Sequence, residues 1–219
     1  MGAVKLKKVI RPDKQRAAQR AEVPEEIFVY LYYERGIDDD KDLVGSVVLA
    51  KESLTYKEIH QVTRELRFDT HPWKYPKVIG VAFLECKEGR FHSSKSTRDN
   101  PKYLKKRRPV YCGLYPRIPK SYAGLGLGTL MYKALLKLAA WDSKKLRRKR
   151  LYFMPSASEA IKGCTSDVAW RCYHSLAKRG YLSNLTRSIW RRREHLRKDI
   201  YKVIRIPALP VELVERKAA

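Results

Sequence analysis

Three glycines at alternate positions lie between a strand-like segment and an amphipathic helical pattern. Gly124, Gly126 and Gly128 follow the apolar segment 109–118 and directly precede a helix predicted over 126–141. Glycine lets the backbone turn tightly and approach a ligand without a side-chain clash, and a helix N-terminus presents unpaired N–H groups with a partial positive charge. The segment therefore predicts a strand–turn–helix unit that can hold a phosphate group. The alternative is a tight turn that binds nothing.

The helix prediction comes from apolar residues that recur at intervals of three and four positions. These residues are Leu127, Leu130, Met131, Ala134, Leu135 and Leu138. The glycines do not fit two better-known phosphate loops. No Gly-Lys-Ser/Thr sequence follows them, as a Walker loop requires. They also lie past the middle of the chain, whereas a dinucleotide fingerprint lies at the first turn of a βαβ unit.

Strand and helix patterns along the rest of the chain predict an α/β fold. Further strands are predicted at 25–36, 43–50, 77–89, 109–118, 151–157 and 199–207, and further helices at 55–68 and from Ser166 to Gly180. We divide the chain into a basic N-terminal arm, 1–25, a single α/β domain, 26–207, and a C-terminal tail, 208–219.

The chain is strongly basic. Its 219 residues include 48 Lys and Arg against 23 Asp and Glu, a formal net charge of +25. Such a surplus suggests a polyanionic partner, either nucleic acid or an acidic assembly such as a ribonucleoprotein or a virion. The cations gather in clusters at 102–108, 144–150 and 187–198. Aromatic residues beside them, including Trp141 and Tyr152, suit stacking on bases, although charge runs are also common as solvated surface.

Several protein classes are excluded. No stretch approaches the roughly 18 uncharged apolar residues that a membrane-spanning helix needs, and charges interrupt the N-terminal segment where a secretion signal would be apolar. Cys86, Cys112, Cys164 and Cys172 are widely spaced and match no zinc-binding pattern. We expect reduced thiols, no metal site and a cytoplasmic protein without a membrane segment.

The glycine segment resembles the pyrophosphate loop of the GCN5-related N-acetyltransferase (GNAT) superfamily. Its spacing Ala123-x-x-Gly126-x-Gly128 is similar to the family pattern Gln/Arg-x-x-Gly-x-Gly/Ala, with Ala123 in place of Gln or Arg. The family cradle relies mainly on backbone N–H groups, so the resemblance still implies that acetyl-CoA binds here. The implied binding residues are Ile118, Ala123, Gly124, Leu125, Gly126, Gly128, Thr129 and Ser166.

The helix predicted from Ser166 to Gly180 resembles a second family motif, Asn-x-x-Ala-x-x-Phe-Tyr. Ser166 stands for Asn and Cys172 for Phe, while Tyr173 matches the family Tyr. The resemblance implies that Tyr173 protonates the departing CoA thiolate as a general acid. The alternative is a core tyrosine on the inward helix face.

The resemblance covers about residues 109–182 and implies a GNAT-like fold. That fold is a mixed, mainly antiparallel sheet of about six or seven strands with helices on both faces. Two adjacent parallel strands, here 109–118 and 151–157, are expected to splay apart and to hold acyl-CoA in the gap.

The implied function is transfer of an acetyl group from acetyl-CoA to an amine, with the carbonyl oxygen held by a backbone N–H near Ile118. Many family members carry a general-base Glu near the splayed strand, but 109–118 contains no carboxylate. Glu85, His92 and His174 are distant substitutes. The alternative is a catalytically inactive basic module of the same fold that binds nucleic acid, a ribonucleoprotein or a virion assembly through its three clusters.

Overall fold

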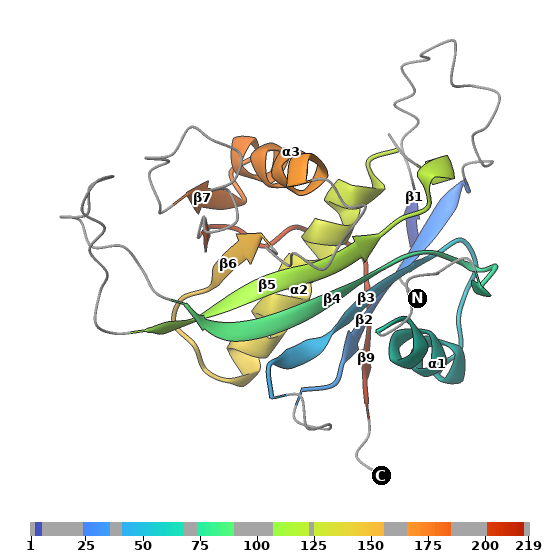
Figure 1. The fold of residues 1–219 in the computed structure, drawn as a ribbon, viewed down its shortest axis with the longest axis horizontal. Coiled ribbons are helices and arrows are strands. Elements are labelled where there is room, and N and C mark those ends of the chain that lie inside the picture. Colours follow the sequence, from blue (N-terminus) through green and yellow to red (C-terminus); the bar gives the residue numbers. More distant parts are fainter. Residues whose placement is uncertain are drawn as a thin grey trace.

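One sheet of nine strands forms the centre of the computed structural model, within the residues that it describes (Figure 1). Those residues are 3–5, 24–35, 41–67, 74–89, 107–122, 125–155, 166–184 and 201–216. The strands are β1 (Ala3–Lys5), β2 (Glu26–Tyr33), β3 (Leu43–Ala50), β4 (Val78–Gly89), β5 (Arg108–Arg117), β6 (Tyr152–Pro155), β7 (Leu182–Asn184), β8 (Tyr201–Val203) and β9 (Glu212–Glu215). The helices are α1 (Tyr56–Leu66), a 3-10 turn (Lys120–Tyr122), α2 (Leu127–Lys145) and α3 (Ser166–Lys178).

The sheet is mixed and mainly antiparallel, as predicted. Its order is β1-β2-β3-β4-β5-β6-β8-β7, and β9 pairs with β2. Strands β2, β3, β4 and β5 run antiparallel to one another in this order, whereas β6 lies parallel to β5. A parallel pair needs a crossover connection, and α2 provides it.

The sheet has more strands than the six or seven predicted because several strands are very short. The segments predicted as an arm, 1–25, and a tail, 208–219, each contribute one: β1 pairs antiparallel with the start of β2, and β9 pairs parallel with its second half. Strands of three or four residues show too little alternation to be recognised in a sequence.

Helices cover both faces of the sheet, which confirms the predicted architecture. Residues of α2 and α3 share one apolar cluster with one face, and residues of α1 share a second cluster with the other face. Helix α2 packs closely because β5 has Gly113 beneath it: a Cβ there would lie 2.9 Å from Leu135 Cδ1. The helix extends to Lys145, about one turn beyond the predicted end. Within the described residues, no helix is long and apolar enough to cross a membrane.

Candidate active site

β5 and β6 pair over only three residues. Their parallel register runs from Tyr111 opposite Phe153 to Gly113 opposite Pro155. Beyond this point β5 continues to Arg117 along β4, and the described part of β6 ends at Pro155. The predicted splay concerns the residues of β6 that would follow Pro155, which lie outside the described residues, so it stays a prediction.

β5 carries a β-bulge near its end. Val81 on β4 pairs with Arg117, and Phe83 pairs with Leu114, so β5 has one residue more than β4 between these two pairs. An extra residue bends the strand that carries it and increases its twist. Pro116 lies within the bulge and has no N–H to donate to a neighbouring strand. The bulge therefore bends β5 shortly before the turn that leads to α2.

The N-terminus of α2 lies a short 3-10 turn beyond the end of β5. Gly126 is its N-cap, in a left-handed conformation with φ of 78°, and among the described residues no side chain caps this helix end. The first helical hydrogen bond runs from Leu130 N–H to the Gly126 carbonyl, at 3.0 Å. The N–H groups of residues 127–129 therefore precede the helical hydrogen-bond series and are available to an anion.

The predicted loop residues are only partly covered by the structure. Ala123 and Gly124 lie outside the described residues. Leu125 is half-buried against the α2–α3 cluster, whereas Gly126 is exposed. A Cβ added to Gly126 would meet no described atom within 4 Å, so this residue faces open space.

Gly128 has a packing role that the sequence pattern does not show. A Cβ at Gly128 would lie 3.2 Å from Cys172 Sγ on α3, and Thr129 Oγ1 lies 3.9 Å from the same sulfur. The first turn of α2 therefore rests against α3. Cys86, Cys112 and Cys172 are buried free thiols, and no group of described residues could hold a metal ion.

Tyr173 is a core residue of α3 that contacts β6. Its side chain is 1% exposed, and its hydroxyl donates to the Met154 carbonyl of β6 at 3.1 Å. Its ring packs edge-on against Tyr132, with centroids 4.9 Å apart. Burial raises the pKa of the Tyr173 hydroxyl well above its ordinary value of 10.0. The hydroxyl therefore keeps its proton at neutral pH, which is the state that a general acid requires.

Ile118 and Ser166 lie where the sequence places them. Ile118 follows β5 beyond the bulge and is half-buried; a Cβ on Gly80 would lie 3.2 Å from Ile118 Cγ1. Ser166 is the first residue of α3, and its side chain lies outside the described set.

Glu85 is a carboxylate on β4, in the cross-strand row next to the last described pair of β5 and β6. It pairs with Cys112 on β5, which in turn pairs with Met154 on β6. Its side chain is 15% exposed and forms a 2.6 Å ion pair with Lys87, and this contact raises the pKa of the Lys87 ammonium. Of the other substitutes, His174 is exposed on α3, and His92 lies outside the described residues.

A buried charged network at the far end of α2 was missed by the sequence analysis. Asp142 is fully buried and accepts hydrogen bonds from Arg35 Nε at 2.6 Å, Arg35 Nη2 at 2.9 Å, Tyr33 Oη at 3.0 Å and Tyr111 Oη at 2.6 Å. Burial and the Asp142 carboxylate raise the pKa of Tyr33 to about 12. The sequence does contain a signal for this burial: Asp142 continues the helical spacing of Leu135 and Leu138, which lie on the buried face of α2.

The chain was compared with known proteins. No family model and no curated protein matches it. Among solved structures, it is similar to AtaTR bound with AcCoA, with a TM-score of 0.40 and 13% identity over 80% of this chain and 92% of that chain. It is also similar to a mutant AtaT toxin bound to the C-terminus of the antitoxin AtaR, with a TM-score of 0.36 and 12% identity over 73% of this chain. Arabidopsis thaliana NAA60 in complex with a bisubstrate analogue gives a TM-score of 0.30 and 14% identity over 74% and 73% of the two chains.

These likenesses are weak, and the chain spans 66% of the AtaT chain bound to AtaR, just under two thirds. The function proposed below therefore depends on this chain's own geometry. Its mixed sheet, parallel β5–β6 pair and glycine-led α2 agree with the fold expected from the N-acetyltransferase resemblance.

Proposed function

We propose that the chain binds acyl-CoA between β5 and β6 and transfers the acyl group, most simply acetyl, to an amine. One observation carries this proposal: β5 lies parallel to β6, and the N-terminus of α2, with no described side-chain cap, follows the end of β5. The N–H groups of residues 127–129 would hold the pyrophosphate, since the partial positive charge of a helix N-terminus favours an anion. Strand edges beyond Gly113 offer backbone hydrogen bonds to the amides of the CoA arm.

Acyl-CoA supplies a thioester with a thiolate as its leaving group. In our proposal a backbone N–H near Ile118 stabilises the negative charge that develops on the carbonyl oxygen. Tyr173 donates its proton to the departing thiolate. Its hydroxyl already donates to the Met154 carbonyl of β6, so a rotation of the hydroxyl hydrogen is enough to change its acceptor.

The acceptor amine must lose a proton, and Glu85 is the residue that we assign to this step through bound water. It lies on β4, in the row next to the last described pair of β5 and β6. A glutamate carboxylate can act as a general base toward an amine through one water molecule. Glu85→Gln keeps the shape of the side chain and removes this capacity, so turnover should fall while acetyl-CoA affinity is kept.

Binding of acetyl-CoA to the purified protein is the first test. A ligand at about 100 times its Kd stabilises a protein by about 2.7 kcal/mol, which raises the Tm of a chain of this size by roughly 5–10 °C. Gly126→Val, which puts a branched side chain in front of the helix end, should abolish most of this shift. The absence of any shift in the parent protein would overturn the proposal.

Turnover is the second test, measured as release of free CoA thiol with peptide N-termini, lysine side chains, polyamines and small aminated sugars as acceptors. Each acceptor is compared with a blank lacking amine, because slow hydrolysis also releases thiol. The amine that gives the largest kcat/KM over the blank identifies the acceptor class.

A catalytically inactive basic module is the second candidate. Ala123 at the start of the loop and the absence of a carboxylate in 109–118 favour it. So does the meeting of two predicted clusters: Arg108 Nη1 donates to Tyr152 Oη at 2.8 Å, and Arg150 bonds the same hydroxyl and helps to lower its pKa, against the opposing effect of burial.

Acetyl-CoA binding without turnover on any amine would favour this inactive module. Nucleic-acid binding would then appear as an affinity that falls steeply with salt, since each neutralised phosphate releases counterions.

A further inference from the structure

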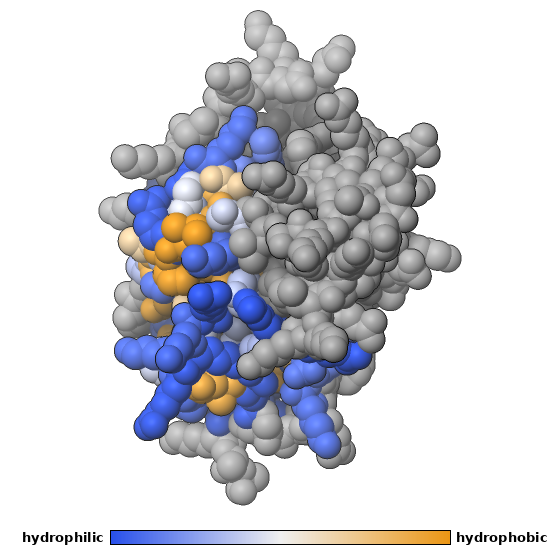
Figure 2. Space-filling view, turned by 90° about the vertical axis from the view of Figure 1, so that its left-hand side faces the viewer, coloured by the Kyte–Doolittle hydropathy of each residue, from blue (hydrophilic) through white to orange (hydrophobic). Residues whose placement is uncertain are grey.

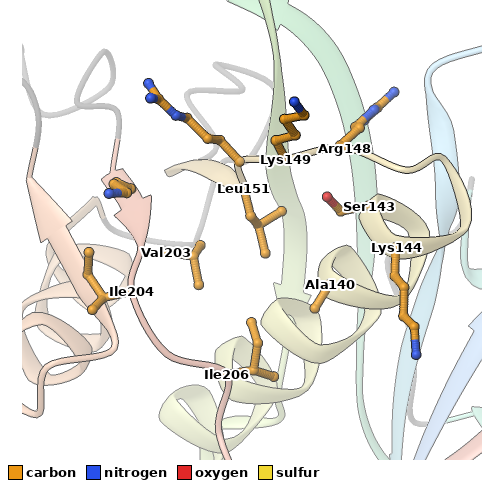
Figure 3. Close-up of a pocket in the computed structure, with 11 residues that line it drawn as sticks. Ala140, Ser143, Lys144, Arg148, Lys149, Leu151, Val203, Ile204 and Ile206 are labelled. Carbon is orange, nitrogen blue, oxygen red and sulfur yellow. The ribbon is translucent and has the colours of Figure 1, made fainter.

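A groove of about 510 Å³ lies away from the proposed acyl-CoA site. Its walls are the C-terminal end of α2, the connection from Arg148 to Leu151, and the chain from Lys202 to Ile206 (Figure 3). The proposed CoA site lies at the opposite end of α2, about 28 Å away for a helix of 19 residues. The acyl transfer proposed above makes no use of this groove.

The interior of the groove is aliphatic. Leu151, Val203 and Ile206 point toward its middle, as Figure 3 shows. Ile204 is 56% exposed and Ile206 is 39% exposed. Figure 2 shows that apolar patches on one face of the molecule are bordered by hydrophilic residues. Exposed apolar residues that gather in one concave place indicate a binding surface.

The rim of the groove is cationic. The cations among its lining residues are Lys144, Arg148, Lys149, Arg150 and Lys202, and no described lining residue is acidic. Figure 3 shows Lys144 and Lys149 pointing away from the middle of the groove.

The guanidinium group of Arg148 is held by buried side chains. Its Nη1 donates to Tyr111 Oη at 2.9 Å and to Cys86 Sγ at 3.0 Å. It also lies 3.9 Å from Asp142 Oδ2. Asp142 is fully buried and pairs with both Arg35 and Arg148. Arg148 is therefore a structural part of the wall, and the other cations among the lining residues are Lys144, Lys149, Arg150 and Lys202.

The adjoining sequence adds more positive than negative charge. The segment 185–200, which precedes β8, contains six Arg or Lys and two Asp or Glu. Arg108 joins Arg150 at the Tyr152 hydroxyl. Among the described lining residues, the positive charge of the groove has no acidic counterpart, so the groove is complementary to an acidic ligand.

We propose that this groove binds an acidic amphipathic segment of a partner protein. Such a segment, most simply one helix, places apolar side chains on the aliphatic floor and carboxylates against the cations on either side. Nucleic acid fits less well, because single strands bind by stacking bases on aromatic rings. No aromatic ring is among the described lining residues, and nearby Tyr152 is 4% exposed.

The test uses a fluorescent peptide of about 18 residues, or about five helical turns, with Leu on one face and Glu on both flanks. A peptide of the same composition in scrambled order and a single-stranded RNA of similar length are titrated beside it by anisotropy. The segregated peptide should bind at least about tenfold more tightly than the scrambled peptide, a difference of about 1.4 kcal/mol.

Two pairs of variants locate the binding. Ile204→Ser with Ile206→Ser should raise the peptide Kd at least about tenfold, whereas Leu146→Ser, which changes an exposed residue outside the groove lining, should not. The double variant Lys149→Glu with Lys202→Glu should weaken binding similarly.

The charge control is Lys51→Glu with Lys57→Glu, which changes exposed lysines beside and within α1 and should have little effect. Acetyl-CoA binding is measured on the same proteins and should be unchanged by every groove variant. Equal affinity for the segregated and scrambled peptides would overturn the proposal. So would RNA that binds more tightly than the peptide and is lost in the same lysine variants, because the groove would then be a nucleic-acid site.

Discussion

Replacing Gly126 with alanine should weaken CoA binding far more than it destabilises the fold. Gly126 has a φ of 78°, and a Cβ there would meet no described atom within 4 Å. An alanine in this conformation costs about 1–2 kcal/mol, which lowers the Tm of a chain of this size by roughly 2–8 °C. The variant should therefore fold, with a methyl group in front of the N–H groups that we assign to the pyrophosphate.

The loss of affinity follows from the hydrogen bonds at stake. A hydrogen bond to a charged group contributes about 1.5–3 kcal/mol, so losing one should raise the Kd for CoA roughly 10- to 150-fold. The backbone of the alanine variant could instead relax out of the left-handed conformation. The same N–H groups would then turn away from the pyrophosphate, and the loss of CoA affinity should have the same size.

Gly128→Ala is the matched control. Its Cβ would lie 3.2 Å from Cys172 Sγ, which crowds α3, but alanine within a helix is about 1 kcal/mol more favourable than glycine. These effects oppose each other, so the free energy of unfolding should change by less than about 1 kcal/mol. The GNAT loop pattern accepts Gly or Ala at this position, so CoA affinity should change less than about threefold, or 0.6 kcal/mol.

Calorimetric titration with CoA and acetyl-CoA, together with urea unfolding, measures both quantities. Unchanged affinity in a folded Gly126→Ala protein would refute the assignment of the cradle. Equal losses in the two variants would instead point to a displaced helix.

Three further outcomes test other parts of the structure. Tyr173→Phe should lower turnover more than acetyl-CoA affinity, because the ring packing stays while the proton donor is lost; steady-state kinetics with an unchanged rate would leave Tyr173 with a structural role alone. Asp142→Asn should cost about 3–5 kcal/mol in urea unfolding, since it leaves the Arg35 guanidinium part-buried without its carboxylate; a loss below about 1 kcal/mol would contradict the network. The hydrogen bond from Lys77 lowers the pKa of Glu58 from 4.5 to about 2. Stability from ionised Glu58 is therefore present above pH 4.5 and lost as pH falls toward 2, so parent and Glu58→Gln Tm values should converge over that range.

The long elements could be predicted from the sequence because their signals are local. Apolar residues from Leu127 to Leu138 recur with the helical period, and α2 forms there. The strands predicted at 43–50 and 77–89 were also found, as β3 and β4. The strands β1 and β9 could not be recognised, because three or four residues are held by their pairing with β2 rather than by their own pattern.

The binding and catalytic roles of the candidate site stay predictions. The structure places Gly126 at the start of α2 and Tyr173 on α3, as the motif spacing predicted, and Tyr173 is a fully packed core residue. The close packing of Gly128 against Cys172 could not be predicted from the sequence, because it depends on where α3 lies. Asp142 was not recognised as a buried acceptor, because its partner Arg35 lies 107 residues away.

The sequence by itself determined the α/β class, the glycine-led helix and the large positive charge, since each depends on composition or on neighbours within a few residues. Only the tertiary structure decided that β5 carries a bulge opposite β4, because a bulge is a mismatch between two paired strands and does not exist in one strand alone. The groove also depends on the tertiary structure. It brings residues 140–151 together with residues 202–206, and antiparallel pairing of β6 with β8 holds these distant segments side by side.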